Sequence, residues 1–145
     1  MKLKFRKIHP EAKSPEYQTK GSAGLDLCAC VPYEIFLQRG VRFTCPTGIA
    51  MDIPEGFEGQ VRPRSGLAHK KGLTVLNSPG TIDSDFRGEI CVILINHGDQ
   101  VISINSGDRI AQLVIAPVMR VELVQAGDLS STERGEGGFG STGVA

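Results

Sequence analysis

The sequence predicts an all-β fold, a sandwich or jelly roll, on three observations. Short apolar runs recur along the chain and are separated by Gly, Pro, Asn and Asp. Several of these runs alternate between apolar and polar or small residues, which is typical of half-buried strands. Helical periodicity is nearly absent. Many short strands joined by regular turns indicate an all-β architecture.

The expected strands are, in chain order, Leu25–Val31, Tyr33–Leu37, Gly48–Ile53, Leu73–Leu76, Glu89–Ile95, Gln100–Ile104, Arg109–Ala116 and Val118–Val124. The run Ile90–Ile95 is apolar on both faces, which suits a strand in the middle of a sandwich or against another subunit. A further strand ends at Pro63. One short helix is expected over Ser65–Lys71, because Gly72 follows it and cations occupy its last turn.

The chain has 145 residues, the length of one domain that buries roughly two-thirds of its unfolded surface. Its formal net charge is zero, so neither nucleic acid nor an anionic membrane is expected as a partner. The basic N-terminus lacks the apolar stretch of a signal peptide, and no apolar run approaches the length that spans a membrane. We therefore expect a cytoplasmic protein that holds any anion in a local site.

Four cysteines are present, Cys28, Cys30, Cys45 and Cys91. None of their spacings is the C-x-x-C of a zinc site. We expect small buried thiols rather than metal ligands or disulfides.

The segment from Arg62 to Ala68 is the first candidate for anion binding. Ser65 stands at the start of the expected helix, where free N–H groups and the helix dipole favour an anion. Arg64 can bind a phosphate through two hydrogen bonds. Helix capping by Ser65 and a solvated Arg64 would explain the segment equally well.

The segment from Leu76 to Glu89 is the densest polar cluster. Asn77 and Gly80 mark a turn between two apolar runs, which predicts a hairpin whose polar groups could pair with a nucleobase edge. Asp83 shares one side of the extended chain with Asp85, and such a carboxylate could deprotonate water or bind a divalent metal. Ordinary turn chemistry is the alternative.

Two polar residues stand inside apolar runs. Asp26 lies opposite an apolar face, which an edge strand would explain. Gln112 needs partners if it is buried, either backbone groups or a polar ligand. The histidines have no ligand or catalytic spacing and are interpreted as structural or surface groups.

The glycine-rich segment Arg134–Gly143 also contains Phe139 and two hydroxyl groups. Glycines let a backbone approach a ligand and present its N–H groups to phosphate. It is no nucleotide P-loop, because no Lys follows and no helix remains to be opened. A flexible tail is the alternative, yet a solvated tail has no need for Phe139. The composition suggests a segment that orders over an anionic ligand with a flat ring.

Together, five segments resemble the five motifs of the trimeric dUTP pyrophosphatase (dUTPase) family. They are Ala23–Ala29, Arg62–Gly72, Gly80–Glu89, Gly107–Val114 and Arg134–Gly143. The resemblance implies a jelly roll or distorted β-barrel with one short helix, assembled as a homotrimer with shared active sites. It also implies a core over residues 1–125 and a flexible glycine-rich lid over residues 126–145 of the same domain.

The resemblance further implies Mg²⁺-dependent hydrolysis of dUTP to dUMP and pyrophosphate. That reaction would limit uracil incorporation into DNA and supply dUMP for thymidylate synthesis. It makes Asp83 the base that activates water for attack on the α-phosphorus, and Asp26 an indirect Mg²⁺ ligand acting through water. The residues it implies for substrate binding are Arg64, Ser65, Gly66 and Gln112 on the phosphates, Asn77, Thr81, Ile82 and Cys91 on uracil, Asp83 and Phe86 near the sugar and α-phosphate, and Arg134, Phe139, Gly140 and Ser141 in the lid.

One position departs from the family pattern, which usually has Tyr where this chain has Phe86. The ring can still pack beneath deoxyribose and obstruct a 2′-hydroxyl. We therefore expect dUTP to remain strongly preferred over UTP.

Two other functions fit the sequence less well. A dCTP deaminase of the same superfamily has the segment Arg-Ser-Ser-x-Ala-Arg, whereas this chain has Arg64-Ser-Gly-Leu-Ala-His69. A non-catalytic β-sandwich binding module would have no need for the carboxylate of Asp83.

Overall fold

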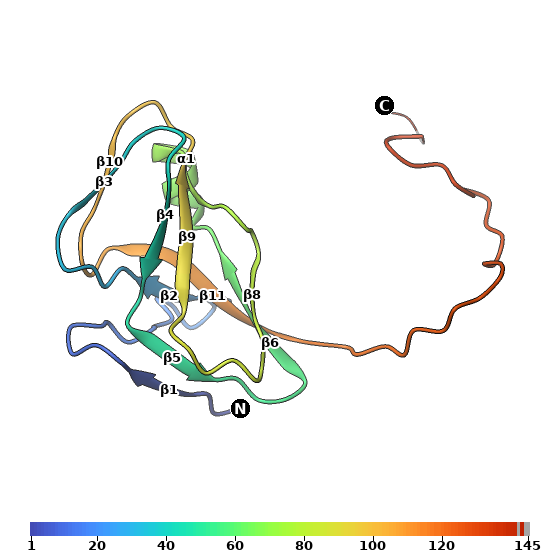
Figure 1. Cartoon of the computed structure of the whole chain (residues 1–145), viewed down its shortest axis with the longest axis horizontal. Coiled ribbons are helices and arrows are strands. Elements are labelled where there is room, and N and C mark those ends of the chain that lie inside the picture. The colour runs from blue at the N-terminus through green and yellow to red at the C-terminus, as the bar shows by residue number, and fades with distance from the viewer. Residues whose placement is uncertain (142, 144–145) are drawn as a thin grey trace.

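The computed structural model describes residues 1–141 and residue 143. Its one helix is short and the remaining elements are strands (Figure 1). The elements are β1 (Lys4–Lys7), β2 (Leu25–Cys28), β3 (Ile35–Leu37), β4 (Arg42–Pro46), β5 (Ile49–Asp52), β6 (Phe57–Arg62), α1 (Ser65–Lys71), β7 (Leu73–Val75), β8 (Gly80–Ile82), β9 (Cys91–Asn96), β10 (Ile102–Ile104) and β11 (Arg109–Pro117).

The strands form small antiparallel sheets that pack into one β structure. The largest has the order β2-β11-β6-β8, and a second has the order β4-β9-β7. Two pairs, β1 with β5 and β10 with β3, complete the fold. The prediction of an all-β jelly roll with one short helix is confirmed.

The core lies between these sheets and follows from the alternation of side chains along the strands. Val92 and Leu94 of β9 and Ala111 and Leu113 of β11 are fully buried. Residues two apart on a strand share one face, so each of these strands presents an apolar face to the interior.

Most expected strands are present, several with shorter bounds than the apolar runs suggested, although β11 extends one residue further, to Pro117. The structure adds β1, β4, β6 and β8, of which only β6 had a signal, the Pro63 that ends it. All four residues of β1 are exposed, so this strand leaves no buried face to detect in the sequence. β6 does alternate, with Gly59 and Val61 buried between polar residues, but the run is short and interrupted by glycine.

The expected strand over Val118–Val124 is wrong for this chain, since no strand lies there. Val121, Leu123 and Val124 are 70%, 91% and 79% exposed. An isolated apolar segment has no neighbour to supply ladder hydrogen bonds, so alternation alone does not make a strand.

The expected hairpin around Asn77 is confirmed in part. Its two arms pair, because β7 is antiparallel to β9 with Val75 opposite Leu94. The connection between them is long rather than tight. It contains β8, which pairs with β6 in the other sheet.

All four cysteines are free thiols. Cys45 is fully buried, and burial raises the pKa of its thiol to about 12. Cys91 is exposed, so the expectation of a buried thiol is wrong at that position. Cys91 is the first residue of β9, and the buried residues of that strand begin only after it, at Val92.

After β11 the chain leaves the core and runs outward as an extended tail (Figure 1). Val118 N donates to Gly56 O at 2.9 Å, at the point of departure. Beyond it, the described residues are held by local turns, such as Gly137 N to Arg134 O at 3.1 Å. No helix in the described part of the chain is long and apolar enough to cross a membrane.

Candidate active site

The first group of candidate residues lies at the start of α1. The N-cap residue is Arg64, with extended backbone and no capping side chain, so Ser65 is the first helical residue and does not cap the helix. The carbonyl of Arg64 accepts from Leu67 N and Ala68 N at 3.0 Å each. The N–H groups of Ser65 and Gly66 have no acceptor within the helix, as at every helix start. Both residues are exposed and can present these groups to an anion.

Asp26 of β2 holds Arg64 in place. Its Oδ1 lies 3.1 Å from Arg64 Nε, and its Oδ2 lies 3.1 Å from Arg109 Nη1. Arg64 Nη1 also donates to Arg109 O at 3.2 Å. Asp26 is only 8% exposed although β2 is an edge strand. Arg64 is thus an ordered side chain rather than a solvated one.

Gln112 of β11 belongs to the same group. It lies opposite Asp26 on one side and Arg62 on the other. Its Nε2 donates to Pro63 O at 3.0 Å. A Cβ at Gly24 would overlap Gln112 Oε1, so this glycine lets the amide lie against the chain. Backbone therefore satisfies the amide nitrogen and fixes Gln112 beside the segment that carries Arg64.

Arg109 was absent from the expected site. A signal existed, because a buried carboxylate in a strand requires a cationic partner. Arg109 opens β11, and its register partner on β2 is Cys28, two residues from Asp26. Two guanidinium groups around one carboxylate leave a net positive charge at the start of α1.

The second group lies in the turn after β8. Phe86 N donates to Asp83 O at 3.2 Å, so Asp83 and Phe86 are the two ends of one turn. Asp83 is exposed. It lines an open cavity of about 600 Å³ together with Glu55, Glu58, Asp85 and Arg120, among others. Carboxylates therefore dominate the charged lining of this cavity.

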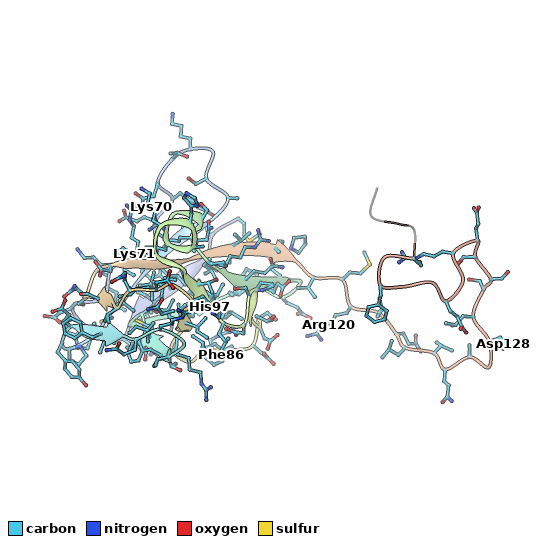
Figure 2. All side chains as sticks on the ribbon, turned by 90° about the horizontal axis from the view of Figure 1, so that it is seen from above. Lys70, Lys71, Phe86, His97, Arg120 and Asp128 are labelled. Carbon is cyan, nitrogen blue, oxygen red and sulfur yellow. The ribbon has the colours of Figure 1, made fainter. Side chains whose placement is uncertain are left out.

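The Phe86 ring lies against Gly88. A Cβ on Gly88 would stand 2.7 Å from Phe86 Cζ and 2.9 Å from Cε2, closer than side chains approach one another. The ring is 41% exposed, and Figure 2 shows it at the surface of the core. The absence of a side chain at Gly88 thus lets the Phe86 ring pack directly against the backbone there.

Of the residues expected to read a base, Asn77, Thr81 and Ile82 precede this turn and Cys91 follows it. Gly80 is buried, and a Cβ there would stand 3.1 Å from Asn77 Nδ2. Thr81 pairs with Gln60 of β6, and Ile82 with Gly59. Cys91 starts β9 opposite Pro46.

Arg64 and Asp83 are not brought together within one chain. The β6–β8 register places Ile82 opposite Gly59, so Asp83 follows beside Glu58. Arg64 is six positions further along the chain, which at ~3.3 Å per strand residue is about 20 Å away. In Figure 1, α1 lies at the top of the core, whereas the connection that follows β8 runs along its bottom.

The lid residues form a third group, remote from both others. Phe139 is fully exposed, and its backbone has a positive φ of 49°. Arg134 Nε donates to Gly137 O at 2.7 Å within the tail itself. Gly140 and Ser141 are exposed too. The tail leaves the core beyond Arg120, and Asp128 lies well away from the core (Figure 2).

No group of three or more His, Cys, Asp or Glu side chains among the described residues is arranged to hold a metal ion. Both oxygens of Asp26 are engaged by arginines. A cation near Asp26 would therefore need most of its ligands from elsewhere.

Comparison with known proteins gives one consistent result. A family model described as dUTPase matches residues 10–143. The deoxyuridine 5'-triphosphate nucleotidohydrolase of Hydrogenobaculum sp. is 56% identical over 144 residues, covering 99% of this chain and 99% of the relative. The protein of the same name from Beijerinckia indica is 59% identical over 141 residues, covering 95% of this chain and 88% of the relative.

Solved structures agree with the sequence comparison. The dUTPase of Staphylococcus bacteriophage 80alpha with dUPNHPP has a TM-score of 0.88 and 30% identity, covering 99% of both chains. A mutant dUTPase from phage phi11 of S. aureus has a TM-score of 0.81 and 26% identity, covering 90% of this chain and 100% of that chain. The latter structure reveals the coordination of a structural Mg(II) ion.

Proposed function

This chain belongs to the dUTPase family and hydrolyses dUTP, and we propose that Asp83 is the base that drives the reaction. The match of the family model over residues 10–143 carries the activity. The named relatives are nucleotidohydrolases, which speaks against a dCTP deaminase and against a non-catalytic module. The roles of individual residues rest on the geometry described above and on the family resemblance.

Asp83 would accept a proton from a water molecule while the oxygen of that water attacks the α-phosphorus. The bond from that phosphorus to the bridging oxygen breaks, and pyrophosphate leaves with the electron pair while dUMP keeps the new hydroxyl oxygen. Asp83 is exposed in an open cavity, so water and substrate can reach it. One positioned base typically contributes about 10²- to 10⁴-fold to the rate.

The phosphates would be held at the start of α1. The N–H groups of Ser65 and Gly66 and the guanidinium of Arg64 would neutralise phosphate oxygens, with Gln112 beside them. The ion pairs of Asp26 support this role, because they hold Arg64 before substrate arrives. Stabilisation by preorganised charges needs no rearrangement during the reaction.

Mg²⁺ fits this site as an ion held mainly by the substrate's phosphates. Asp26 would contribute only through water, since arginines occupy both of its oxygens. When bound, Mg²⁺ would neutralise charge on the phosphates. The structural Mg(II) ion of the phi11 relative supports metal binding in the family, not this particular role.

Uracil would be read by Asn77 and by the backbone of Thr81, Ile82 and Cys91, with Phe86 beneath the sugar. A base-reading site built from paired polar groups rejects cytosine strongly, because mismatched groups would be left without partners. The ring of Phe139 would stack on the base, and Arg134, Gly140 and Ser141 would close over the phosphates.

A homotrimer with shared sites would bring the three groups of residues together from different subunits. The separation of Arg64 from Asp83 within the chain supports sites formed between subunits. The exposed apolar side chains of residues 118–124 support a partner that covers them. Four further expectations stay predictions. They are the glycine-rich lid, the boundary near residue 125, the cytoplasmic location and the supply of dUMP for thymidylate synthesis.

Pyrophosphate release from dUTP with Mg²⁺ tests the assignment of the base. The variant Asp83→Asn should bind dUTP yet lose at least about 100-fold in kcat. Asp85→Asn is the matched control, because it removes a neighbouring carboxylate of the same cavity. Turnover that survives in Asp83→Asn would show that another group is the base.

A further inference from the structure

Arg87 ties the turn of Asp83 and Phe86 to the strand β5. Its Nη1 donates to Ser84 O at 2.6 Å and to Phe86 O at 2.9 Å. Its Nη2 lies 2.6 Å from Oδ1 of Asp52, the last residue of β5. One guanidinium therefore binds two carbonyl groups of the turn and one carboxylate of the framework.

The turn has little else to hold it. It lies between β8, which ends at Ile82, and β9, which begins at Cys91. Asp83, Asp85 and Phe86 are all exposed. The internal hydrogen bond from Phe86 N to Asp83 O, at 3.2 Å, is long. Contacts from outside must therefore fix where the turn sits.

The far end of the connection has its own anchor. Glu89 Oε1 accepts from Gly48 N at 2.7 Å, just before β5. Arg87 thus binds the last residue of β5, and Glu89 binds the residue before its first. Of these two side chains, Arg87 is the one that contacts the turn.

We propose that Arg87 is a positioning residue for hydrolysis, acting together with Asp52. It keeps the carboxylate of Asp83 and the ring of Phe86 in fixed places relative to the framework. This inference rests on the roles proposed for those two residues. An arginine suits the task because its rigid fork of N–H donors can serve several acceptors at once, whereas a lysine ammonium is a single point charge on a flexible stem.

The contact acts on geometry more than on stability. The side chains of Arg87 and Asp52 are 55% and 47% exposed, and ion pairs at such exposure contribute little to folding. Catalysis is more sensitive, because a displacement of about 1 Å at a reacting group can lower the rate ~100-fold.

Variants of Arg87 and Asp52 test the proposal in the full chain. Arg87→Met removes all three interactions, and Asp52→Asn removes only the charged link to β5. We expect kcat for dUTP to fall about 10- to 100-fold in Arg87→Met and less in Asp52→Asn, with a smaller change in KM. The preference for dUTP over UTP should fall as well, because Phe86 moves with the turn.

The pair Arg39–Asp99 supplies the control. It is an exposed ion pair of 3.2 Å that lies outside the candidate site. Arg39→Met should leave kcat, KM and the dUTP preference unchanged. The thermal midpoint should move little in any of these variants, and Arg87→Lys should recover only part of the lost kcat.

Two results would overturn the proposal. One is kcat for dUTP within about twofold of the parent in both Arg87→Met and Asp52→Asn. The other is a lowered thermal midpoint with kcat and the dUTP preference intact, which a merely structural role would give. If Arg87→Met does not fold, Asp52→Asn decides alone, because it preserves the size of the side chain.

The same assay separates this idea from the assignment of the base. An active Asp83→Asn variant would refute the base, whatever the variants of Arg87 do. An inactive Asp83→Asn variant together with a fully active Arg87→Met variant would refute only the positioning role.

Discussion

The Asp26 carboxylate lies 3.1 Å from the Arg64 guanidinium, although the two residues belong to different elements. Asp26 is a residue of β2, and Arg64 caps α1. The contact shows how a buried acid can serve an anion site. It holds the arginine that is to meet phosphate, while the second cation, Arg109, leaves the group with a net positive charge.

Removing the Asp26 carboxylate should weaken both the fold and catalysis. In Asp26→Asn the two arginines lose their shared anion. The carboxylate is buried but the side chains of Arg64 and Arg109 are 27% and 47% exposed, so the loss should cost about 1 to 3 kcal/mol. We expect a lower thermal midpoint and about a tenfold loss in kcat/KM for dUTP, because Arg64 is no longer held.

Asp99→Asn is the control for this substitution, since Asp99 pairs with Arg39 at the surface. It should leave both quantities unchanged. Wild-type kinetics in Asp26→Asn would mean that Arg64 needs no preorganisation by this acid.

Enlarging Gly88 should alter the choice between sugars. In Gly88→Ala the new methyl group would overlap the Phe86 ring, whose Cζ lies 2.7 Å from the Cβ position. The ring must tilt away, so its obstruction of a 2′-hydroxyl weakens. We expect the ratio of kcat/KM for dUTP to that for UTP to fall about tenfold.

Gly21→Ala is a suitable comparison, because nothing lies within 4 Å of its Cβ position. A double variant with Phe86→Leu identifies the route of the effect. If Gly88 acts through the ring, Gly88→Ala should change the ratio little further in that background.

The cysteines should differ in reactivity and pH dependence. Cys91 is exposed and should react with a thiol reagent in the native protein, whereas buried Cys45 should react only after unfolding. Burial raises the pKa of Cys45 from 9.0 to about 12. Between these values the native thiol keeps its proton while the unfolded thiol loses it, so stability falls as pH rises through this range.

Chemical denaturation between pH 8 and about 11 measures this effect. Cys45→Ala should have a smaller decline across that range than the parent. An equal decline in both proteins would assign the pH dependence to other groups.

The sequence points to candidate residues of the site but not to their arrangement, and their roles stay predictions. The motif spacing pointed to Asp26, Arg64 and Gln112, whose closeness follows from the register of β11 with β2 and with β6. Arg109 was missed because strand pairing between distant segments decides which cation meets Asp26. The run Val118–Val124 has the alternation of a strand, but hydrophobic pattern cannot show whether a partner strand exists within the chain.

The separation of Arg64 from Asp83 was equally invisible in the sequence. Both lie in recognisable motifs, yet β6 carries them to opposite ends of one sheet. The ring of Phe139 in the tail is likewise exposed, and the sequence does not tell which subunit's site it would cover. Whether a lid serves its own chain or a neighbour depends on assembly, which no local pattern encodes.

Truncation of the chain after Arg134 should abolish hydrolysis while leaving the fold intact. The removed residues include Phe139 and Ser141, which make no hydrogen bond to the core in the described structure. Loss of a closing lid exposes the phosphates to water and removes the stacking ring. We expect a loss of at least about 100-fold in kcat/KM with an unchanged thermal midpoint and sedimentation coefficient.

Mixing this truncated chain with Asp83→Asn then tests whether the tail acts in a neighbouring subunit. Each variant alone should be inactive. In mixed trimers, some sites combine the intact Asp83 of a truncated chain with the intact tail of an Asp83→Asn chain. For random assembly from equal amounts, about a quarter of the sites should recover activity if the tail acts on a neighbour. A tail that closes over its own subunit would restore none, because no single chain then carries both groups.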